Sequence, residues 1–349
     1  NELCPSERIR PLTDEPAWRD VRLAGDCLVA YGVQRTERPG ASQLAKELRH
    51  RVPQRLVDLI HTEQLTPRER AEAGSVLSAI GDPRDLNQMV PIPAGSFTMG
   101  TKEAEVDAIV AATIDWYKRV RPNDLPDEDA IRRWILWEVP QSEITVAGFR
   151  ISKYPVTNGQ YAAFVKATGH RPPGHWRGEK PPDELRNHPV THVSWHDAVA
   201  YCAWLSAERD EVYRLPTEAE WEKAARGTDG RAYPWGDAFD AHRCNMYETG
   251  IGQISAVGLF TQAALPYGLA DMSGNVYEWT STLFGDEWPY PYVAGDGRED
   301  LQAKDSVPRV LRGGSFVISS TFVRCAARDG SFPDYRNFNI GFRVVSPGC

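Results

Sequence analysis

Apolar residues recur at helical spacing along the first quarter of the chain and change to shorter alternations after it. This period predicts short helices over 43–48, 55–60 and 67–80. The last of them begins at N-cap Thr66, with Glu69 completing a capping box, and it stops before Gly81. So few helices cannot bury their own apolar faces. We therefore expect residues 1–88 to form a small helical segment that leans on the rest of the chain.

From Met89 onward, short strands and glycine-containing turns alternate with short capped helices. Helix starts are expected at Thr157, Ser194 and Thr217, where residues with cap chemistry precede apolar runs. Residues 102–138 are charged and helical in pattern, with prolines as interruptions, which indicates an insertion. The sequence predicts an α+β, loop-rich domain over 89–349 that follows the N-terminal helical segment.

The composition agrees with a loop-rich fold held by large aromatic residues, because the chain contains 11 Trp, 28 Gly and 26 Pro. A net charge of -8 argues against a nucleic-acid partner. No apolar run approaches the roughly 18 residues of a membrane span, so no membrane partner is expected. Arginine far outnumbers lysine, a bias typical of GC-rich genomes or of a hot habitat. Neither explanation reveals a function.

Six cysteines are too sparse for a disulfide scaffold, and no Cys-x-x-Cys pair occurs. The chain starts at Asn1 with no Met and no signal peptide, so we expect it to be a piece of a longer polypeptide or a processed one. Sequence motifs for a nucleophile elbow, a phosphate-binding loop or a dinucleotide site are absent. His188, His192 and His196 are spaced four apart, but Pro189 and β-branched neighbours favour an extended segment, in which they would not converge on a metal.

Seven motifs occur in order over about residues 89–346. They are Ile92-Pro93-Ala94-Gly95, Lys153-Tyr154-Pro155-Val156-Thr157-Asn158, His188-Pro189-Val190, Arg214-Leu215-Pro216-Thr217-Glu218, Gly274-Asn275-Val276-Tyr277-Glu278-Trp279, Arg312-Gly313-Gly314-Ser315 and Gly341-Phe342-Arg343. Together they resemble the sulfatase-modifying domain of formylglycine-generating enzymes, which implies a C-type-lectin-like fold. The resemblance specifies the fold far more than the activity, because the family includes enzymes and pure binders.

The enzymes that this sequence resembles carry two copper-binding cysteines shortly after the Gly-Gly-Ser motif. Residues 316–323 contain no cysteine here, so we expect no copper and no enzyme activity. The family's disulfide partners of Cys325 and Cys202 correspond to Ala225 and Val344. The resemblance therefore implies that both cysteines are free, which suits a reducing cytoplasm.

Residues 309–345 also resemble the variable region of proteins diversified by retroelements, which use the same fold to display a mutable surface. In those proteins, adenine-rich codons are randomised between fixed scaffold codons. The resemblance implies scaffold roles for Arg324, Ala326, Arg328, Pro333, Arg336, Gly341, Phe342 and Arg343. It implies ligand-binding roles for Phe316, Val317, Ile318, Ser319, Ser320, Thr321, Phe322, Asp329, Gly330, Ser331, Phe332, Tyr335, Asn337, Phe338 and Asn339. An ordinary family loop of accidental composition is the alternative.

Acidic residues beside a glycine-containing turn can supply carboxylate and main-chain carbonyl oxygens, which are the ligands that Ca²⁺ prefers. The resemblance implies a structural calcium site formed by Asp271, Gly274, Val276 and Glu278 through carboxylates and main-chain carbonyls. A second family calcium site would use Asn245 and Met246, but its other ligands do not stand out between residues 248 and 257.

The sequence therefore predicts non-catalytic recognition of a protein or other macromolecular ligand through residues 316–339, in a bacterial, cytoplasmic protein. Residues 64–85 resemble the helical segment that joins an upstream signalling or NTPase module to this domain in multidomain bacterial proteins, which implies that this chain is the C-terminal part of a larger multidomain protein. Two alternatives stay open. One is a metal-dependent oxidase of the same fold acting on a Cys or a small thiol, and the other is a structural interaction module within a larger signalling protein.

Overall fold

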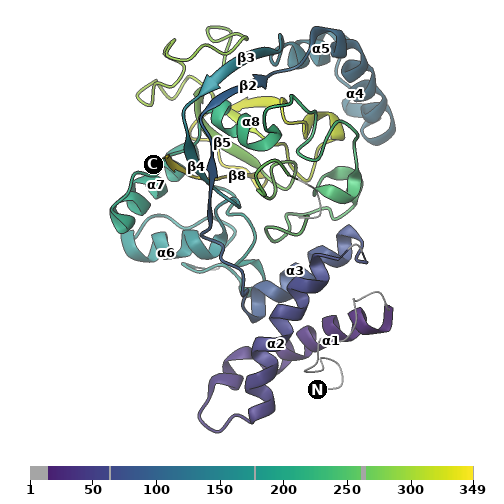
Figure 1. Cartoon of the computed structure of the whole chain (residues 1–349), viewed down its shortest axis with the longest axis vertical. Coiled ribbons are helices and arrows are strands. Elements are labelled where there is room, and N and C mark those ends of the chain that lie inside the picture. The colour runs from purple at the N-terminus through teal and green to yellow at the C-terminus, as the bar shows by residue number, and fades with distance from the viewer. Residues whose placement is uncertain (1–14, 63, 177, 261–264, 349) are drawn as a thin grey trace.

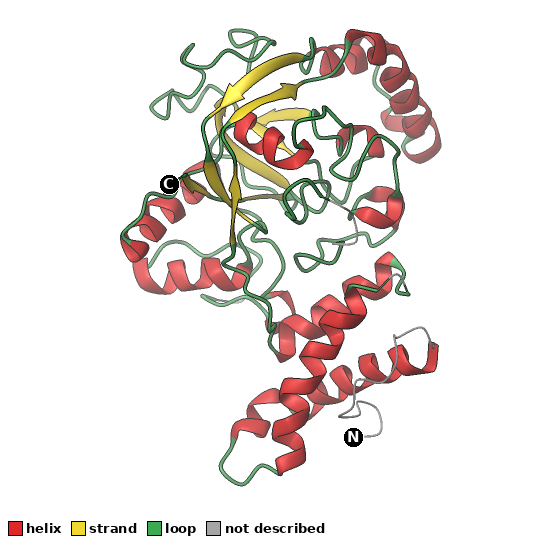
Figure 2. Ribbon diagram, in the orientation of Figure 1, coloured by secondary structure: helices red, strands yellow, loops and turns green. Residues whose placement is uncertain are grey.

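The computed structural model describes residues 15–62, 64–176, 178–260 and 265–348. Figure 1 shows a group of N-terminal helices at one end and a larger part in which helices and loops surround short sheets. The strands gather at the centre of that larger part, and much of the remaining chain is loop (Figure 2). Among the described helices, none is long and apolar enough to cross a membrane.

The N-terminal part consists of three helices that pack on one another and a short 3-10 helix. They are α1 (Glu15–Tyr31), η1 (Val33–Glu37), α2 (Gln43–Ile60) and α3 (Pro67–Ile80). The capping box of Thr66 and Glu69 is confirmed at the start of α3. Two differences from the prediction stand out. Helix α1 was not anticipated, and the stretches predicted as separate helices are one helix, α2, which continues through the buried Pro53.

The expectation that these helices lean on the rest of the chain is confirmed. Their buried side chains form one cluster with Ala256, Leu259 and Phe260 of the larger part. Two arginines reinforce the contact, because Arg68 donates to the Gly250 carbonyl at 2.6 Å and Arg84 donates to the Gly258 carbonyl at 3.0 Å. The helical segment and the larger part therefore share an apolar core.

The larger part contains three small sheets, with strand orders β1-β4-β9, β2-β3 and β7-β6-β5-β8. The strands are β1 (Met89–Ile92), β2 (Gly95–Met99), β3 (Ser142–Val146), β4 (Phe149–Ser152), β5 (Tyr277–Leu283), β6 (Arg309–Arg312), β7 (Arg328–Ser331), β8 (Ile340–Phe342) and β9 (Val345–Pro347). The pair β5–β8 is parallel, and the other pairs are antiparallel.

Five α-helices and six 3-10 helices surround these sheets in the described part of the chain. The α-helices are α4 (Val106–Val120), α5 (Glu128–Leu136), α6 (Asn158–Thr168), α7 (Trp195–Arg209) and α8 (Glu218–Arg226). The 3-10 helices are η2 (Glu103–Glu105), η3 (Pro122–Asp124), η4 (Asp183–Leu185), η5 (Ala241–Arg243), η6 (Tyr247–Thr249) and η7 (Ser320–Phe322). The predicted starts at Thr157, Ser194 and Thr217 are confirmed, each as a complete capping box. The helices within 102–138 are confirmed as α4 and α5.

Tryptophans hold the centre of the larger part, as the composition indicated. Trp279 is fully buried and donates its indole N–H to the Val193 carbonyl at 3.1 Å. Trp195 donates in the same way to the Thr280 carbonyl at 2.9 Å. Because a buried indole N–H needs an acceptor, these bonds fix the orientation of the rings as well as their burial. They tie the start of α7 to strand β5.

Candidate ligand-binding surface

Residues 309–345 are held in the four-stranded sheet at three places. Strands β6, β7 and β8 all lie within this segment, and β6 pairs with both β5 and β7. Two loops, residues 313–327 and 332–339, connect these strands. We call them the first loop and the aromatic loop. Their backbones start and end in ordered strands, so the sheet determines which way each loop faces.

Arginines of this segment form buried ion pairs with carboxylates from distant elements. The pairs are Arg324–Glu138, Arg328–Glu218 and Arg343–Glu278, with shortest nitrogen–oxygen distances of 2.7, 3.0 and 2.6 Å. The predicted scaffold residues are buried, as expected, with Arg336 as the exception. Arg336 is exposed and pairs with Asp197. Fixed arginines therefore interrupt the candidate variable positions and anchor them to the core.

The helical insertion packs on the first loop, and the burial of three positions in this loop corrects part of the predicted ligand-facing set. Thr113 of α4 is hydrogen-bonded to Thr321 at 3.0 Å, and Trp134 of α5 packs on Phe322 with ring centroids 6.2 Å apart. Phe316, Ser319 and Thr321 are buried, and Val317, Ile318, Ser320 and Phe322 are half-buried. The prediction assumed that these side chains take no part in the core, and the burial of Phe316, Ser319 and Thr321 overturns that assumption for these three.

The aromatic loop carries three exposed aromatic side chains. Phe332, Tyr335 and Phe338 have 52%, 49% and 47% of their surface exposed. The loop backbone is nevertheless anchored, because the Pro333 carbonyl accepts the Trp195 N–H at 3.0 Å and the Asn337 carbonyl accepts the His192 N–H at 2.8 Å. Aromatic side chains thus stand in solvent on a backbone that is tied to the start of α7.

The remaining predicted positions divide in the same way. Asp329 is exposed, while Gly330, Ser331 and Asn337 are half-buried. Asn339 is buried and donates to the Ser315 hydroxyl at 3.1 Å, so its assignment to the ligand-facing set is corrected. A Cβ at Gly330 would lie 2.2 Å from the Phe284 ring, so a larger residue there would displace that ring. Gly330 is therefore a constrained position and not a freely variable one.

The described cysteines are free thiols, which confirms the prediction for Cys202 and Cys325. Both are buried, and burial raises the pKa of each to about 12. A thiol reacts through its thiolate, so neither side chain has the character of a reactive cysteine at neutral pH. Cys325 lies within the first loop, just after residues 316–323.

The four residues expected to hold calcium fit a cation only in part. Both oxygens of Glu278 pair with Arg343, and one also accepts the Trp221 indole N–H at 2.7 Å. Asp271 accepts the Gly258 N–H at 2.7 Å, and burial raises its pKa to about 6. No group of three or more His, Cys, Asp or Glu in the described residues could hold a metal ion. The calcium site stays a prediction, and in this arrangement Glu278 offers no free oxygen to it.

The three histidines at a spacing of four do not converge. His188 is buried, His196 is exposed and pairs with Asp305 at 2.9 Å, and His192 lies against the ring of His175. His192 has a backbone φ of 59°, a left-handed conformation that is uncommon for residues other than glycine. The interpretation of these residues as ordinary histidines agrees with their separate surroundings.

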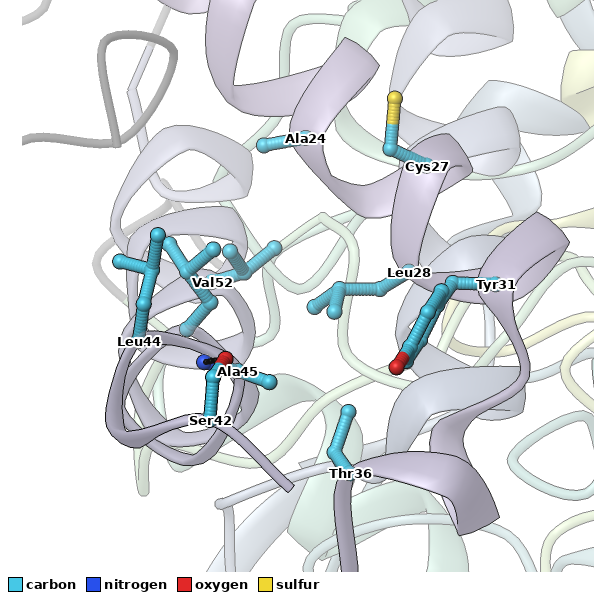
Figure 3. A pocket seen from close by; sticks show the side chains of 10 residues that line it. Ala24, Cys27, Leu28, Tyr31, Thr36, Ser42, Leu44, Ala45 and Val52 are labelled. Carbon is cyan, nitrogen blue, oxygen red and sulfur yellow. Dashed lines mark hydrogen bonds between the residues drawn. The ribbon is translucent and has the colours of Figure 1, made fainter. Parts of the chain in front are cut away.

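The cavity that Figure 3 shows belongs to the N-terminal helices and not to residues 309–345. It has a volume of about 430 Å³ and lies among α1, η1 and α2, lined by apolar side chains such as Leu28 and Leu48. A smaller cavity of about 200 Å³ borders the aromatic loop and is lined by Tyr161, Arg171, His192, Asp197 and Arg336 among others. No local sequence pattern reveals this second cavity, because its lining residues lie far apart in the chain.

Comparison with known proteins places the chain in a family. The sulfatase-modifying factor enzyme 1-like domain matches residues 78–347. The formylglycine-generating enzyme of Mus musculus is 29% identical over an alignment that covers 92% of this chain and 91% of that enzyme. The inactive C-alpha-formylglycine-generating enzyme 2 of Bos taurus is 31% identical, covering 76% of this chain and 90% of that protein. The relatives thus include an enzyme and an inactive protein.

Solved structures show the same fold. PvdO from Pseudomonas aeruginosa is 30% identical with a TM-score of 0.56, covering 74% of this chain and 94% of that one. Treponema denticola variable protein 1 is 20% identical with a TM-score of 0.52, covering 74% and 95%. The α+β, C-type-lectin-like fold expected from the motifs is therefore confirmed. This chain belongs to the family of the sulfatase-modifying factor enzyme 1-like domain.

Proposed function

We propose that this protein recognises a macromolecular ligand, most simply another protein, without catalysing a reaction, and that the aromatic loop makes the contact. The proposal narrows the surface expected from the sequence. It keeps Phe332, Tyr335 and Phe338 with the exposed Asp329, and it leaves out the buried positions of the first loop.

The observation that carries the proposal is the exposure of three large aromatic side chains on an anchored loop. Aromatic side chains supply much of the binding free energy at protein interfaces, and they do so best on a backbone that is already ordered. Asn337 adds an adaptable polar group beside them, hydrogen-bonded to the Tyr335 hydroxyl at 3.1 Å. Aromatic anchors among small polar residues are typical of binding surfaces that recognise proteins.

The described residues do not offer the cysteine pair that the oxidase alternative would need. Thiol oxidation by the family's copper mechanism uses two cysteines shortly after the Gly-Gly-Ser motif, and residues 316–323 hold none. Cys325, just after this stretch, is buried and protonated at neutral pH. Stoichiometric copper binding together with oxygen-dependent turnover of a cysteine peptide would overturn the proposal of a non-catalytic binder.

The diversification hypothesis has a test in the genome that encodes this chain. We expect a near-copy of the coding sequence for residues 309–345 beside a reverse transcriptase gene, with differences almost confined to template adenines. From the geometry, we also expect these differences at the codons for Phe332, Tyr335 and Phe338. A search that finds no near-copy, or one whose differences fall on the codons for Arg324 and Arg343, would contradict the hypothesis.

We propose a reducing compartment, such as the cytoplasm, for this chain. The support is that Cys27, Cys202, Cys244 and Cys325 are all free thiols in the described part. A thiol reagent applied to the unfolded protein from intact cells would test this proposal. We expect the reagent to label all four of these cysteines, because none of them forms a disulfide bond in the structure.

A further inference from the structure

The cavity of about 430 Å³ among α1, η1 and α2 has a floor of buried side chains and an opening of exposed ones (Figure 3). Leu28, Thr36 and Val52 are buried, whereas Tyr31 and Leu44 are 49% and 42% exposed. All five line the cavity. Its volume lies within the roughly 300–1,000 Å³ that is usual for sites of small molecules. The cavity is therefore large enough for a ligand and open to one.

Specific contacts join the three elements around this cavity. The short helix η1 is linked to α2 by the ion pair of Glu37 with Arg49 at 2.5 Å. It is linked to α1 by Arg35, whose guanidinium lies 5.9 Å from the centre of the Tyr31 ring. The start of α2 is fixed as well, because N-cap Ser42 accepts a backbone N–H of the first turn at 3.1 Å. The cavity is thus framed on its three sides and is not a gap between loosely placed helices.

The chemistry of the lining favours an uncharged ligand. None of the ten lining residues is Asp, Glu, Lys, Arg or His, and most of them are apolar. The hydroxyls of Thr36 and Ser42 are already engaged, since Thr36 donates to the Val33 carbonyl at 2.5 Å and Ser42 caps α2. A charged group would lose its hydration here without gaining a counterion, which is costly. An apolar molecule would instead release water from the apolar walls, which is favourable.

The size of the cavity decides between a small molecule and a helix of a partner protein. One turn of an α-helix with its side chains occupies roughly 400–600 Å³. The cavity could therefore hold no more than about one turn. Helices that dock into apolar grooves bind through side chains spread over at least two turns. A small molecule matches the volume, whereas a partner helix would leave most of its contact residues outside.

We propose that the cavity among α1, η1 and α2 binds a small, uncharged, apolar molecule. The ligand lies on the buried floor of Leu28 and Val52 and is covered at the opening by the Tyr31 ring and Leu44. This site belongs to the N-terminal helices and shares no residue with the aromatic loop. It is therefore a second binding site, and it does not rest on the function proposed above.

Fluorescence titration of the full chain with two matched probes tests the proposal. N-phenyl-1-naphthylamine is uncharged and becomes fluorescent in apolar surroundings, and 8-anilinonaphthalene-1-sulfonate has the same ring skeleton with one added sulfonate. We expect the uncharged probe to bind saturably and about tenfold or more tightly than the sulfonate. No saturable binding of the uncharged probe up to about 50 µM would overturn the proposal. Equal affinities would overturn it too, because the lining offers no counterion to a sulfonate.

Two variants locate the site. Ala45 is half-buried and extends toward the cavity in Figure 3, so the ring of Ala45→Phe should fill the space and weaken binding of the uncharged probe about tenfold or more. Tyr31→Ala removes an exposed wall without emptying the core and should weaken binding about fivefold or more. The control is Gln54→Phe, which adds the same ring at an exposed position of α2 outside the lining and should bind as the wild type does. Wild-type affinity in both cavity variants would overturn the proposal.

Hydrogen–deuterium exchange of the wild-type protein separates this site from the aromatic loop. We expect the uncharged probe to slow exchange in α1 and α2 and to leave residues 332–339 unchanged. Tyr335→Ala, which removes an aromatic side chain of the loop, should bind the probe as the wild type does. Slower exchange at residues 332–339 together with weaker binding in Tyr335→Ala would place the probe on the aromatic loop and overturn the proposal. Failure to find a macromolecular ligand for the aromatic loop would contradict the function proposed above and leave this site unaffected.

Discussion

Neighbouring residues of the segment 309–345 differ in what they tolerate because single contacts decide their environment. The rings of Phe316 and Phe338 touch, with centroids 5.8 Å apart, yet the first is buried and almost half of the second is exposed. Gly330 has no room for a Cβ, whereas Phe332, two residues later, stands in solvent. Freedom to vary is therefore a property of each side chain and not of the loop as a whole.

A stability comparison checks this difference. We expect the triple change of Phe332, Tyr335 and Phe338 to Ser to alter the free energy of unfolding by no more than about 1.5 kcal/mol, since exposed substitutions cost about 0.5 kcal/mol or less each. The single change Phe316→Ala should cost about 3 kcal/mol, because it empties a buried site. Urea denaturation measures both. A triple variant that loses as much stability as Phe316→Ala would contradict the assignment.

His188 makes stability depend on pH. Burial lowers its pKa to about 4, whereas a histidine in an unfolded chain titrates near 6.5. Between these values the unfolded chain holds a proton that the folded protein does not. The free energy of unfolding should therefore fall as pH drops through this window, by up to about 1.4 kcal/mol per pH unit. This contribution is complete above about pH 6.5.

Urea denaturation at several pH values between about 7.5 and 4.5 measures the slope. The variant His188→Gln carries no titrating group at this position, so its slope should be smaller than that of the wild type over the same interval. Identical slopes in the two proteins would show that His188 does not cause the dependence.

At the scale of elements, the insertion with α4 and α5 decides which loop faces solvent. It covers the first loop and leaves the aromatic loop open, through contacts such as Thr113 with Thr321. Its end is fixed by Glu138, which accepts hydrogen bonds from Arg324 and from the Thr101 hydroxyl in a buried cluster. The insertion is therefore part of the scaffold and not an appendage.

Breaking that attachment should be costly. Glu138→Gln leaves the buried guanidinium of Arg324 without its counterion, and removal of one partner from a buried pair costs about 3–5 kcal/mol. The matched control is Glu128→Gln, which removes an exposed partner of Arg132 on α5 and should cost less than about 1 kcal/mol. Chemical denaturation compares the two. Equal losses would mean that the Arg324 pair does not anchor the insertion.

The elements that sequence reasoning found are those with local signals. Thr157 and Thr217 cap their helices through residues three positions away, so a short window suffices to predict them. The burial of Thr321 depends instead on Thr113, which lies 208 residues earlier, and no window includes both. The same reason hides the small cavity, because Tyr161 and Arg336 meet only after the chain has folded. Motif resemblance predicted the fold, while long-range contacts decided the site.

At the scale of the whole molecule, the N-terminal helices are joined to the larger part by close packing. Gly74 of α3 faces Ala256 and Leu259, and a Cβ added there would lie 3.0 Å from both side chains. The helices have no room for a larger residue at this contact. A bulky substitution should therefore weaken the junction without touching the aromatic loop.

Gly74→Val tests the junction. Overpacking a tight contact costs about 1–3 kcal/mol, so we expect a loss of this size in the free energy of unfolding and faster proteolysis between α3 and β1. Gly174→Ala is the control, because a Cβ there has no atom within 4 Å and should change neither measurement. Unchanged proteolysis of Gly74→Val would indicate that the helices are not held by this contact.

The strand order has a consequence for how the protein folds as it is synthesised. Strands β8 and β9 are the last in the chain, yet β8 pairs with β5 and β9 pairs with β4, which precedes it by almost 200 residues. Neither sheet is complete until the ribosome has released these residues. The edges of β4 and β5 that pair with them therefore stay unpaired during synthesis. If the proposed diversification takes place, every version of the aromatic loop is made just before this closing step. A loop sequence that causes the unfinished chain to aggregate would then be eliminated before the folded protein could bind a ligand.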